Sequence, residues 1–261
     1  MQPFTNDLVF CVCLAEHPEI TQKFIEIMVG KPVEKLSIVN AQQIRNLDLF
    51  NKSVRFDVLA EDIYGNVYDL EMQTTLTRSL PKRIRYYQAV NTIDTKLKGR
   101  NYEALPDNYV IFICTFDPFQ KGEAVYHFQM MEENYHHDVS YNDGVRTVVI
   151  NTEADDSSLP FELRSTLNYI RTGIPDKEGF TNQLHNCVME MNASKRWRDD
   201  MSTLAELRND SKAEGRVEGK AEQAEKTALM MLHDGKDISE IQRYSGLTLA
   251  QITKLMKGSR Q

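Results

Sequence analysis

The chain has 261 residues, of which 41% are hydrophobic and 26% are charged, as in a soluble globular protein with one sizeable core. Its formal net charge of −7 argues against a protein that coats nucleic acid in general. No apolar stretch approaches the ~20 residues that span a bilayer, and the N-terminus lacks the basic region of a signal peptide. We therefore expect a cytoplasmic protein without a membrane span.

The first predicted elements are two helices within residues 7–29. Apolar residues recur there at spacings of three and four. A proline follows His17 and divides the run, because the residue before a proline avoids the α region. Asp7 is expected to cap the first helix, although Asp7 and Glu16 are also acids that could approach a site elsewhere. Residues 36–50 show no strong period.

Residues 54–73 predict a β-hairpin that carries the candidate site. Two runs rich in β-branched and aromatic residues flank a polar turn that contains glycine. A five-residue loop pairs Glu61 with Val67, and the same register places Asp57 opposite Glu71. Opposed like charges repel, so either a divalent cation offsets the two carboxylates or they splay apart on a solvated outer face.

A helix is expected over residues 81–97, with Ser79 as a candidate N-cap. Its first turns are basic, with Lys82, Arg83 and Arg85. Such a run is usually a solvated face. Its nearness in sequence to the acidic strand gives a second interpretation, in which it contacts phosphate groups.

The remaining pattern of the first part of the chain is typical of an α/β fold. A near-continuous apolar run over 108–116 predicts a central strand that is buried on both faces. Further strands are expected over 124–131 and 145–150, and helical stripes over 159–191. Together these elements predict a sheet with helices on its faces.

The composition changes near Trp197, and we divide the chain into segments 1–197, 198–233 and 234–261. Opposite charges four residues apart predict a charged helical spacer in the second segment. The third predicts two short helices around a Ser-Gly pair and resembles a helix-turn-helix. A unit that reads DNA and a small hairpin for dimerisation or docking both stay open for this segment.

The four cysteines predict neither a disulfide framework nor a zinc site. No C-x-x-C pair occurs among Cys11, Cys13, Cys114 and Cys187, and we expect four reduced, mostly buried thiols. The six histidines show no metal spacing. Because the glycine-rich phosphate loops are also missing, no nucleotide cofactor is expected.

The hairpin and the helix after it resemble a known family. Arg55-Phe56-Asp57 and, fourteen residues after the aspartate, Glu71-Met72-Gln73 are similar to the PD-(D/E)XK nuclease motif in its E-x-Q variant. The fuller string VRFDVLAEDIYGNVYDLEMQ, followed by KRIRYYQAV and YVIFI, resembles the Rpn-like recombination-promoting nucleases, also described as PD-(D/E)XK family putative transposases. The resemblance covers roughly the first 150 residues.

The resemblance implies a restriction-endonuclease-like PD-(D/E)XK fold and a metal-dependent DNA endonuclease, active in recombination or with mobile elements. By this resemblance, Asp57 and Glu71 would ligate Mg²⁺ or Mn²⁺. Gln73 would orient the attacking water in place of the usual lysine, and Arg83 would hold a phosphate of the DNA.

A second hypothesis is a module without enzymatic activity. In that case the nuclease-like fold has lost catalysis, binds DNA or a protein partner, and forms homo-oligomers through the C-terminal helices. Titration with Mn²⁺ separates the two hypotheses, because only the first requires a metal site.

Overall fold

The chain forms two compact units, Met1–Ser194 and Lys195–Gln261. The computed structural model describes residues 1–41, 44–45, 54–55, 57–94, 101–133, 139, 141–154, 157–195 and 223–258. Among these residues, no helix is both long and apolar enough to cross a membrane.

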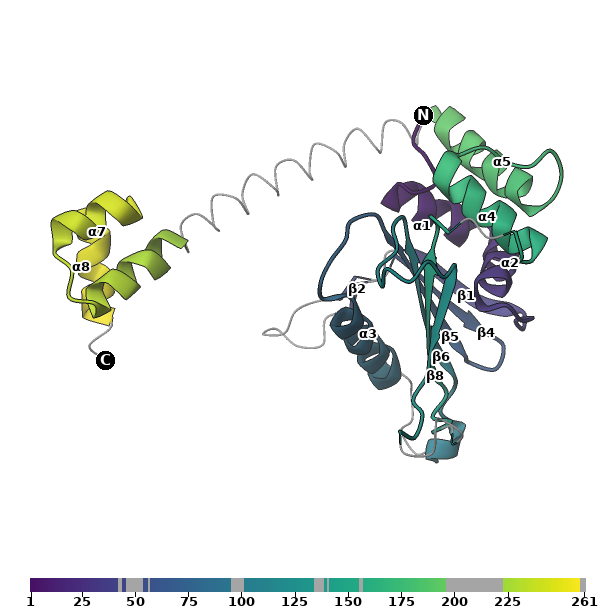
Figure 1. The fold of residues 1–261 in the computed structure, drawn as a ribbon, viewed down its shortest axis with the longest axis horizontal. Helices are drawn as coiled ribbons and strands as arrows, with labels where there is room; N and C mark the ends of the chain where they lie inside the picture. The colour runs from purple at the N-terminus through teal and green to yellow at the C-terminus, as the bar shows by residue number, and fades with distance from the viewer. Residues whose placement is uncertain are drawn as a thin grey trace. The chain divides into compact units, whose positions relative to one another are not determined.

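A mixed six-stranded sheet forms the centre of the first unit (Figure 1). Its strands are β1 (Leu36–Ala41), β4 (Val58–Asp62), β5 (Val67–Gln73), β6 (Asn108–Cys114), β7 (Val125–Phe128) and β8 (Val145–Asn151). They lie in the order β1-β4-β5-β6-β8-β7. β5, β6 and β8 are parallel, whereas β1, β4 and β7 are antiparallel to their neighbours. Every residue of β6 is buried, which confirms the predicted central strand.

Helices cover both faces of this sheet. They are α1 (Asp7–Glu16), α2 (Pro18–Val29), α3 (Leu80–Asp94), α4 (Phe161–Thr172) and α5 (Phe180–Ala193). α3 covers one face, and α1 and α2 cover the other, with α4 and α5 packed against them (Figure 1). A short 3₁₀ helix, η1 (Tyr102–Ala104), precedes β6. The α/β sheet with flanking helices is therefore confirmed.

The first two helices are separated at His17, as predicted, but the cap of α1 is different. Asn6 is the N-cap, and its side-chain oxygen accepts hydrogen bonds from the N–H groups of Leu8 and Val9 at 3.1 and 3.3 Å. A capping side chain has to reach the unpaired N–H groups of the first turn from the residue before the helix. Asp7 is already inside the helix, so the prediction that it is the cap was wrong.

The first strand of the predicted hairpin is interrupted. β3 (Val54–Arg55) pairs with β2 (Ile44–Arg45) in a separate two-stranded sheet. β4 begins only at Val58, and Asp57 lies in a bend before it. β1, for which the sequence showed no period, lies at the edge of the described sheet and pairs there with β4, so its formation depends on a contact distant in sequence.

The register between β4 and β5 is the one predicted from the sequence. Glu61 pairs with Val67, and the ladder runs as far as Val58 opposite Leu70. Asp62 is buried at the start of the turn, where its carboxylate accepts two backbone N–H groups at 2.9 and 3.0 Å. This acid therefore stabilises the turn and fixes the register.

Cys13 and Cys187 form a disulfide, which contradicts the prediction of four reduced cysteines. The bond joins α1 to α5, and the two Cα atoms are 6.0 Å apart. The other two cysteines, Cys11 and Cys114, are buried and form no disulfide, as predicted. A separation of 174 residues carries no signal in the sequence, because only the packing of the two helices brings the pair together.

We expect alkylation of the denatured, unreduced protein to label Cys11 and Cys114 and to leave Cys13 and Cys187 unlabelled. Reduction before labelling should add two labels, since an alkylating agent reacts with a thiol and not with a disulfide. Peptide mass spectrometry measures both results. A Cys13→Ser/Cys187→Ser variant is the control, with two labels in either condition. Four labels without reductant would contradict the disulfide.

In the second unit, three helices pack together among the residues that the structure describes, 223–258. A helix over 223–233 precedes α7 (Ile238–Ser245) and α8 (Leu249–Gly258). Their shared core consists of Ala228, Ile241, Leu247 and Ile252. The sequence predicted a spacer through residue 233, but its last turns belong to this core. Residues 198–222 of that predicted spacer lie outside the described residues.

Candidate functional site

One face of β5 carries three polar side chains that are buried beneath α3. Because side chains alternate along a strand, Asp69, Glu71 and Gln73 lie on the same face. Their exposed fractions are 0%, 1% and 8%. For this face, burial rules out the interpretation as a solvated surface. Buried carboxylates require hydrogen bonds or a countercharge, and the contacts of Glu71 provide both.

Asp57 and Glu71 meet at the start of β4. Glu71 Oε1 accepts the backbone N–H of Asp57 at 3.0 Å, and Asp57 Oδ2 accepts the backbone N–H of Met72 at 3.1 Å. The bend at Asp57 directs its N–H to a side chain on the neighbouring strand. The two acids are thus close, as the sequence predicts, but the contact is made through these side-chain-to-backbone hydrogen bonds, because the β4–β5 ladder ends at Val58 and does not include Asp57.

The Glu71 carboxyl lies among like charges in a poorly solvated place. Burial raises the pKa of Glu71 well above its usual range, and the neighbouring Asp69 and Asp57 raise it further. Arg83 and the N–H of Asp57 act in the opposite direction. An ionised Glu71 therefore depends on a cation beside it.

Arg83, in the first turn of α3, reaches back to β5 and supplies that cation. Its Nη2 donates to Glu71 Oε2 at 2.6 Å, and its Nη1 donates to Gln73 Oε1 at 2.7 Å. The Gln73 amide group in turn donates to the carbonyl oxygen of Thr75, which fixes the direction of the amide. One guanidinium therefore contacts two of the three polar side chains of the strand.

The other basic residues of this helix point elsewhere. Lys82 and Arg85 are exposed, whereas the Arg83 side chain is 36% exposed and turns toward the sheet. Of the basic residues predicted from the sequence, Lys82 and Arg85 are therefore solvated, and Arg83 contacts the acidic cluster.

Tyr87 belongs to the same cluster and was not recognised from the sequence. Its hydroxyl accepts hydrogen bonds from Arg83 Nε and Nη2 at 3.0 and 2.8 Å. The Arg83 guanidinium carbon lies 5.1 Å from the centre of the Tyr87 ring and 5.2 Å from that of Phe112. The available signal was the spacing of four residues between Arg83 and Tyr87, which places both on one face of a helix.

The oxygen donors of the cluster fit a hard divalent cation. Mg²⁺ and Mn²⁺ prefer carboxylate and carbonyl oxygens, and Mg²⁺ commonly keeps several of its waters. Asp57, Glu71 and the amide oxygen of Gln73 offer this chemistry. No group of three or more His, Cys, Asp or Glu suited to a metal occurs among the described residues. α1, whose acids the sequence left open as a further ligand, packs against β1 and β4.

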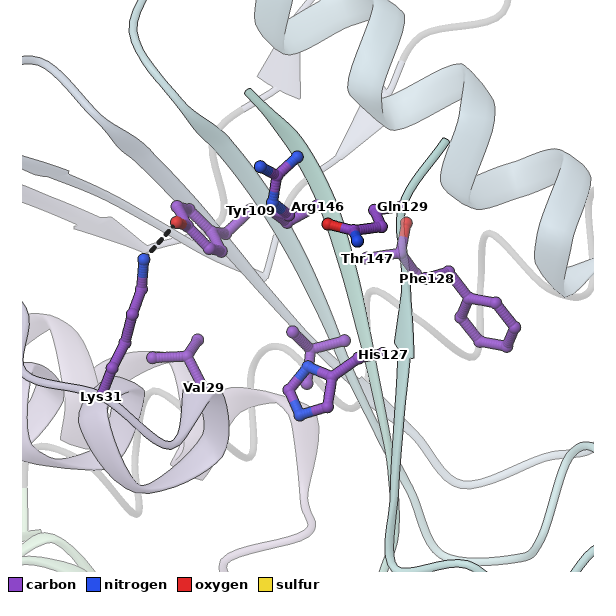
Figure 2. A pocket seen from close by; sticks show the side chains of 9 residues that line it. Val29, Lys31, Tyr109, His127, Phe128, Gln129, Arg146 and Thr147 are labelled. Atoms are coloured by element: carbon purple, nitrogen blue, oxygen red, sulfur yellow. Dashed lines mark hydrogen bonds between the residues drawn. The ribbon is translucent and has the colours of Figure 1, made fainter. Parts of the chain in front are cut away.

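A cavity of about 300 Å³ lies at the end of α2 (Figure 2). Its lining includes Val29, Lys31, Tyr109, His127 and Arg146. Lys31 Nζ donates to the Tyr109 hydroxyl at 2.6 Å, and Arg146 Nη1 is 3.8 Å from Asp143 Oδ1. The cluster of Asp57, in the bend before β4, with Glu71 and Gln73 on β5 is the stronger candidate site, because there two acids, an amide and a guanidinium converge.

A family model described as PD-(D/E)XK nuclease family transposase matches residues 4–154. The matched span includes all six strands of the sheet, α3, and the cluster of Asp57, Glu71, Gln73 and Arg83. Comparisons with curated proteins and with solved structures give no match.

Proposed function

Because the chain belongs to the PD-(D/E)XK nuclease family transposases, we propose that it is a metal-dependent DNA endonuclease that acts in recombination or with mobile elements. The family match confirms the resemblance of the hairpin to this family. The observation that supports the activity is the convergence of two acids, an amide and a guanidinium at the end of β5.

Asp57 and Glu71 are the proposed ligands of Mg²⁺ or Mn²⁺. Asp57 lies in the bend before β4, next to Glu71 on β5, and their like charges repel. The raised pKa of Glu71, caused first by burial and then by Asp69 and Asp57, supports a need for positive charge. When bound, the cation would lower the pKa of a water molecule and neutralise charge on the scissile phosphate.

Gln73 and Arg83 are proposed to act on the water and on the DNA. A neutral amide orients a water molecule by hydrogen bonding but cannot ionise it. Arg83 presents a planar guanidinium with several donors, which suits a phosphate group. The Arg83 side chain is 36% exposed, and a DNA phosphate would approach it from the solvent side.

The inactive module is the second candidate, and the contact between Arg83 and Glu71 favours it. This contact engages a carboxylate oxygen that a metal ion would also use. In that case the unit would bind DNA or a protein partner, and the C-terminal helices would provide homo-oligomerisation. Size-exclusion chromatography with light scattering measures the oligomeric state.

We expect the purified protein to nick or linearise supercoiled plasmid in Mg²⁺ or Mn²⁺ and to stop when EDTA is added, because the acids need a divalent ion for catalysis. Calorimetric titration with Mn²⁺ in the absence of DNA should show binding. Absence of both heat and cleavage would overturn the nuclease and support the inactive module.

A further inference from the structure

Strand β5 carries no cationic residue at the position where the family description places a lysine. In (D/E)XK, a lysine follows the second acid by two residues, and here Gln73 follows Glu71 at that distance. A lysine carries a positive charge with three donors, whereas the glutamine amide is neutral. The strand alone therefore cannot place a positive charge beside the reacting water and phosphate.

A cation from a different element lies at this position. Arg83 Nη1 donates to Gln73 Oε1 at 2.7 Å, while Nη2 of the same guanidinium donates to Glu71 Oε2 at 2.6 Å. Arg83 belongs to the first turn of α3, where its backbone N–H donates to the Ser79 carbonyl at 2.9 Å. The position of this charge is thus set by the start of the helix and by two side chains of the strand.

Two aromatic residues hold the guanidinium in place. Tyr87, one turn further along α3, accepts two hydrogen bonds from it, and its ring and that of Phe112 lie against the cation. Tyr87 and Phe112 also belong to the apolar core between α3 and the sheet, in which both are buried. A guanidinium supported on several sides loses little freedom on reaching its working position.

We propose that Arg83 replaces the lysine of the (D/E)XK motif, with Gln73 as its docking partner and Tyr87 as its positioning residue. This inference rests on the proposed nuclease function. Arginine is not deprotonated in proteins, so its part is that of a fixed charge beside the developing negative charge of the reaction. Gln73 then serves to receive the arginine as well as to orient water.

Exchange of the two side chains tests the proposal. Arg83→Gln should lower kcat for plasmid cleavage by about 100-fold, the size of effect seen when one preorganised electrostatic group is removed. The Gln73→Lys/Arg83→Gln double variant restores a cation on the strand and should recover at least about tenfold of that loss. Arg171→Gln, an exposed change of the same kind on α4, is the matched control and should leave kcat unchanged.

Two further measurements distinguish the proposed catalytic role of Arg83 from a purely structural role. Gln73→Lys alone places two cations together, so its Tm should fall, and adding Arg83→Gln should restore the Tm. Tyr87→Phe removes the hydroxyl that orients Arg83, and should lower kcat about tenfold with KM for DNA unchanged.

The outcomes distinguish the inference from the function on which it rests. If the wild-type protein does not cleave DNA, the proposed function fails and the inference fails with it. If the wild type cleaves and Arg83→Gln cleaves equally well, only the inference is overturned. A double variant that folds but recovers nothing also overturns it, and so does an unchanged kcat in Tyr87→Phe.

Discussion

Asp57→Asn and Glu71→Gln should each reduce plasmid cleavage in Mg²⁺ by at least about 1,000-fold and leave the fold intact. Each change removes a charged oxygen donor of the proposed metal ligands, and a bound metal contributes several kcal/mol to stabilising the transition state. Neither amide changes the size of the side chain. The rate constant for loss of supercoiled plasmid measures the effect, and circular dichroism verifies the fold.

A buried acid of the same hairpin provides the matched control. Asp62→Asn leaves the Asp57 and Glu71 cluster untouched but weakens the hydrogen bonds that close the turn. It should lower the free energy of unfolding by about 1–3 kcal/mol and keep the cleavage rate of the folded protein. Unchanged cleavage by an Asp57→Asn/Glu71→Gln double variant would refute the assignment of the two acids.

Arg83→Met should destabilise the metal-free protein by about 2 kcal/mol at neutral pH. The change leaves the 1% exposed Glu71 carboxyl beside Asp57 and Asp69 without its cation. Loss of one partner from a fully buried pair costs about 3–5 kcal/mol, and the partial exposure of Arg83 reduces this cost. Urea denaturation gives the free energy of unfolding, with Arg171→Met as the exposed control.

Two companion measurements identify Glu71 as the cause. In a Glu71→Gln background, Arg83→Met should cost much less, because the neutral amide needs no countercharge. A ligand that binds the folded state adds to its stability. Saturating Mn²⁺ should therefore stabilise Arg83→Met by more than it stabilises the wild type, because in the variant Arg83 no longer occupies Glu71 Oε2. If the loss of stability is the same in both backgrounds, Arg83 is not the countercharge of Glu71.

Local signals in the sequence were enough to predict the hairpin register and the central strand. The five-residue loop fixed the pairing of Glu61 with Val67, and an apolar run identified β6. The same signals predicted that Asp57 lies near Glu71, but in the structure the ladder ends at Val58, and hydrogen bonds between side chain and backbone bring the two acids together. These features depend on neighbours in sequence, or on the two strands of one hairpin.

The features that the sequence did not reveal depend on contacts between distant elements. The burial of Glu71 requires α3 to lie on the polar face of β5, and nothing in the strand specifies that cover. The disulfide requires α1 to pack on α5. Similarly, Ala228 seemed to belong to a charged spacer, and only its packing against α7 and α8 assigns it to a core. In each case tertiary packing outweighed the local pattern.

The burial of Glu71 also has a consequence for the effect of ionic strength on this protein. Dissolved ions screen exposed charges strongly and buried pairs weakly, so added salt should change the link between Glu71 and Arg83 very little. Contacts with DNA phosphates, in contrast, weaken steeply with salt because bound counterions are released. Concentrated salt would therefore release DNA from the protein, while the ion pair between Arg83 and Glu71 stays intact.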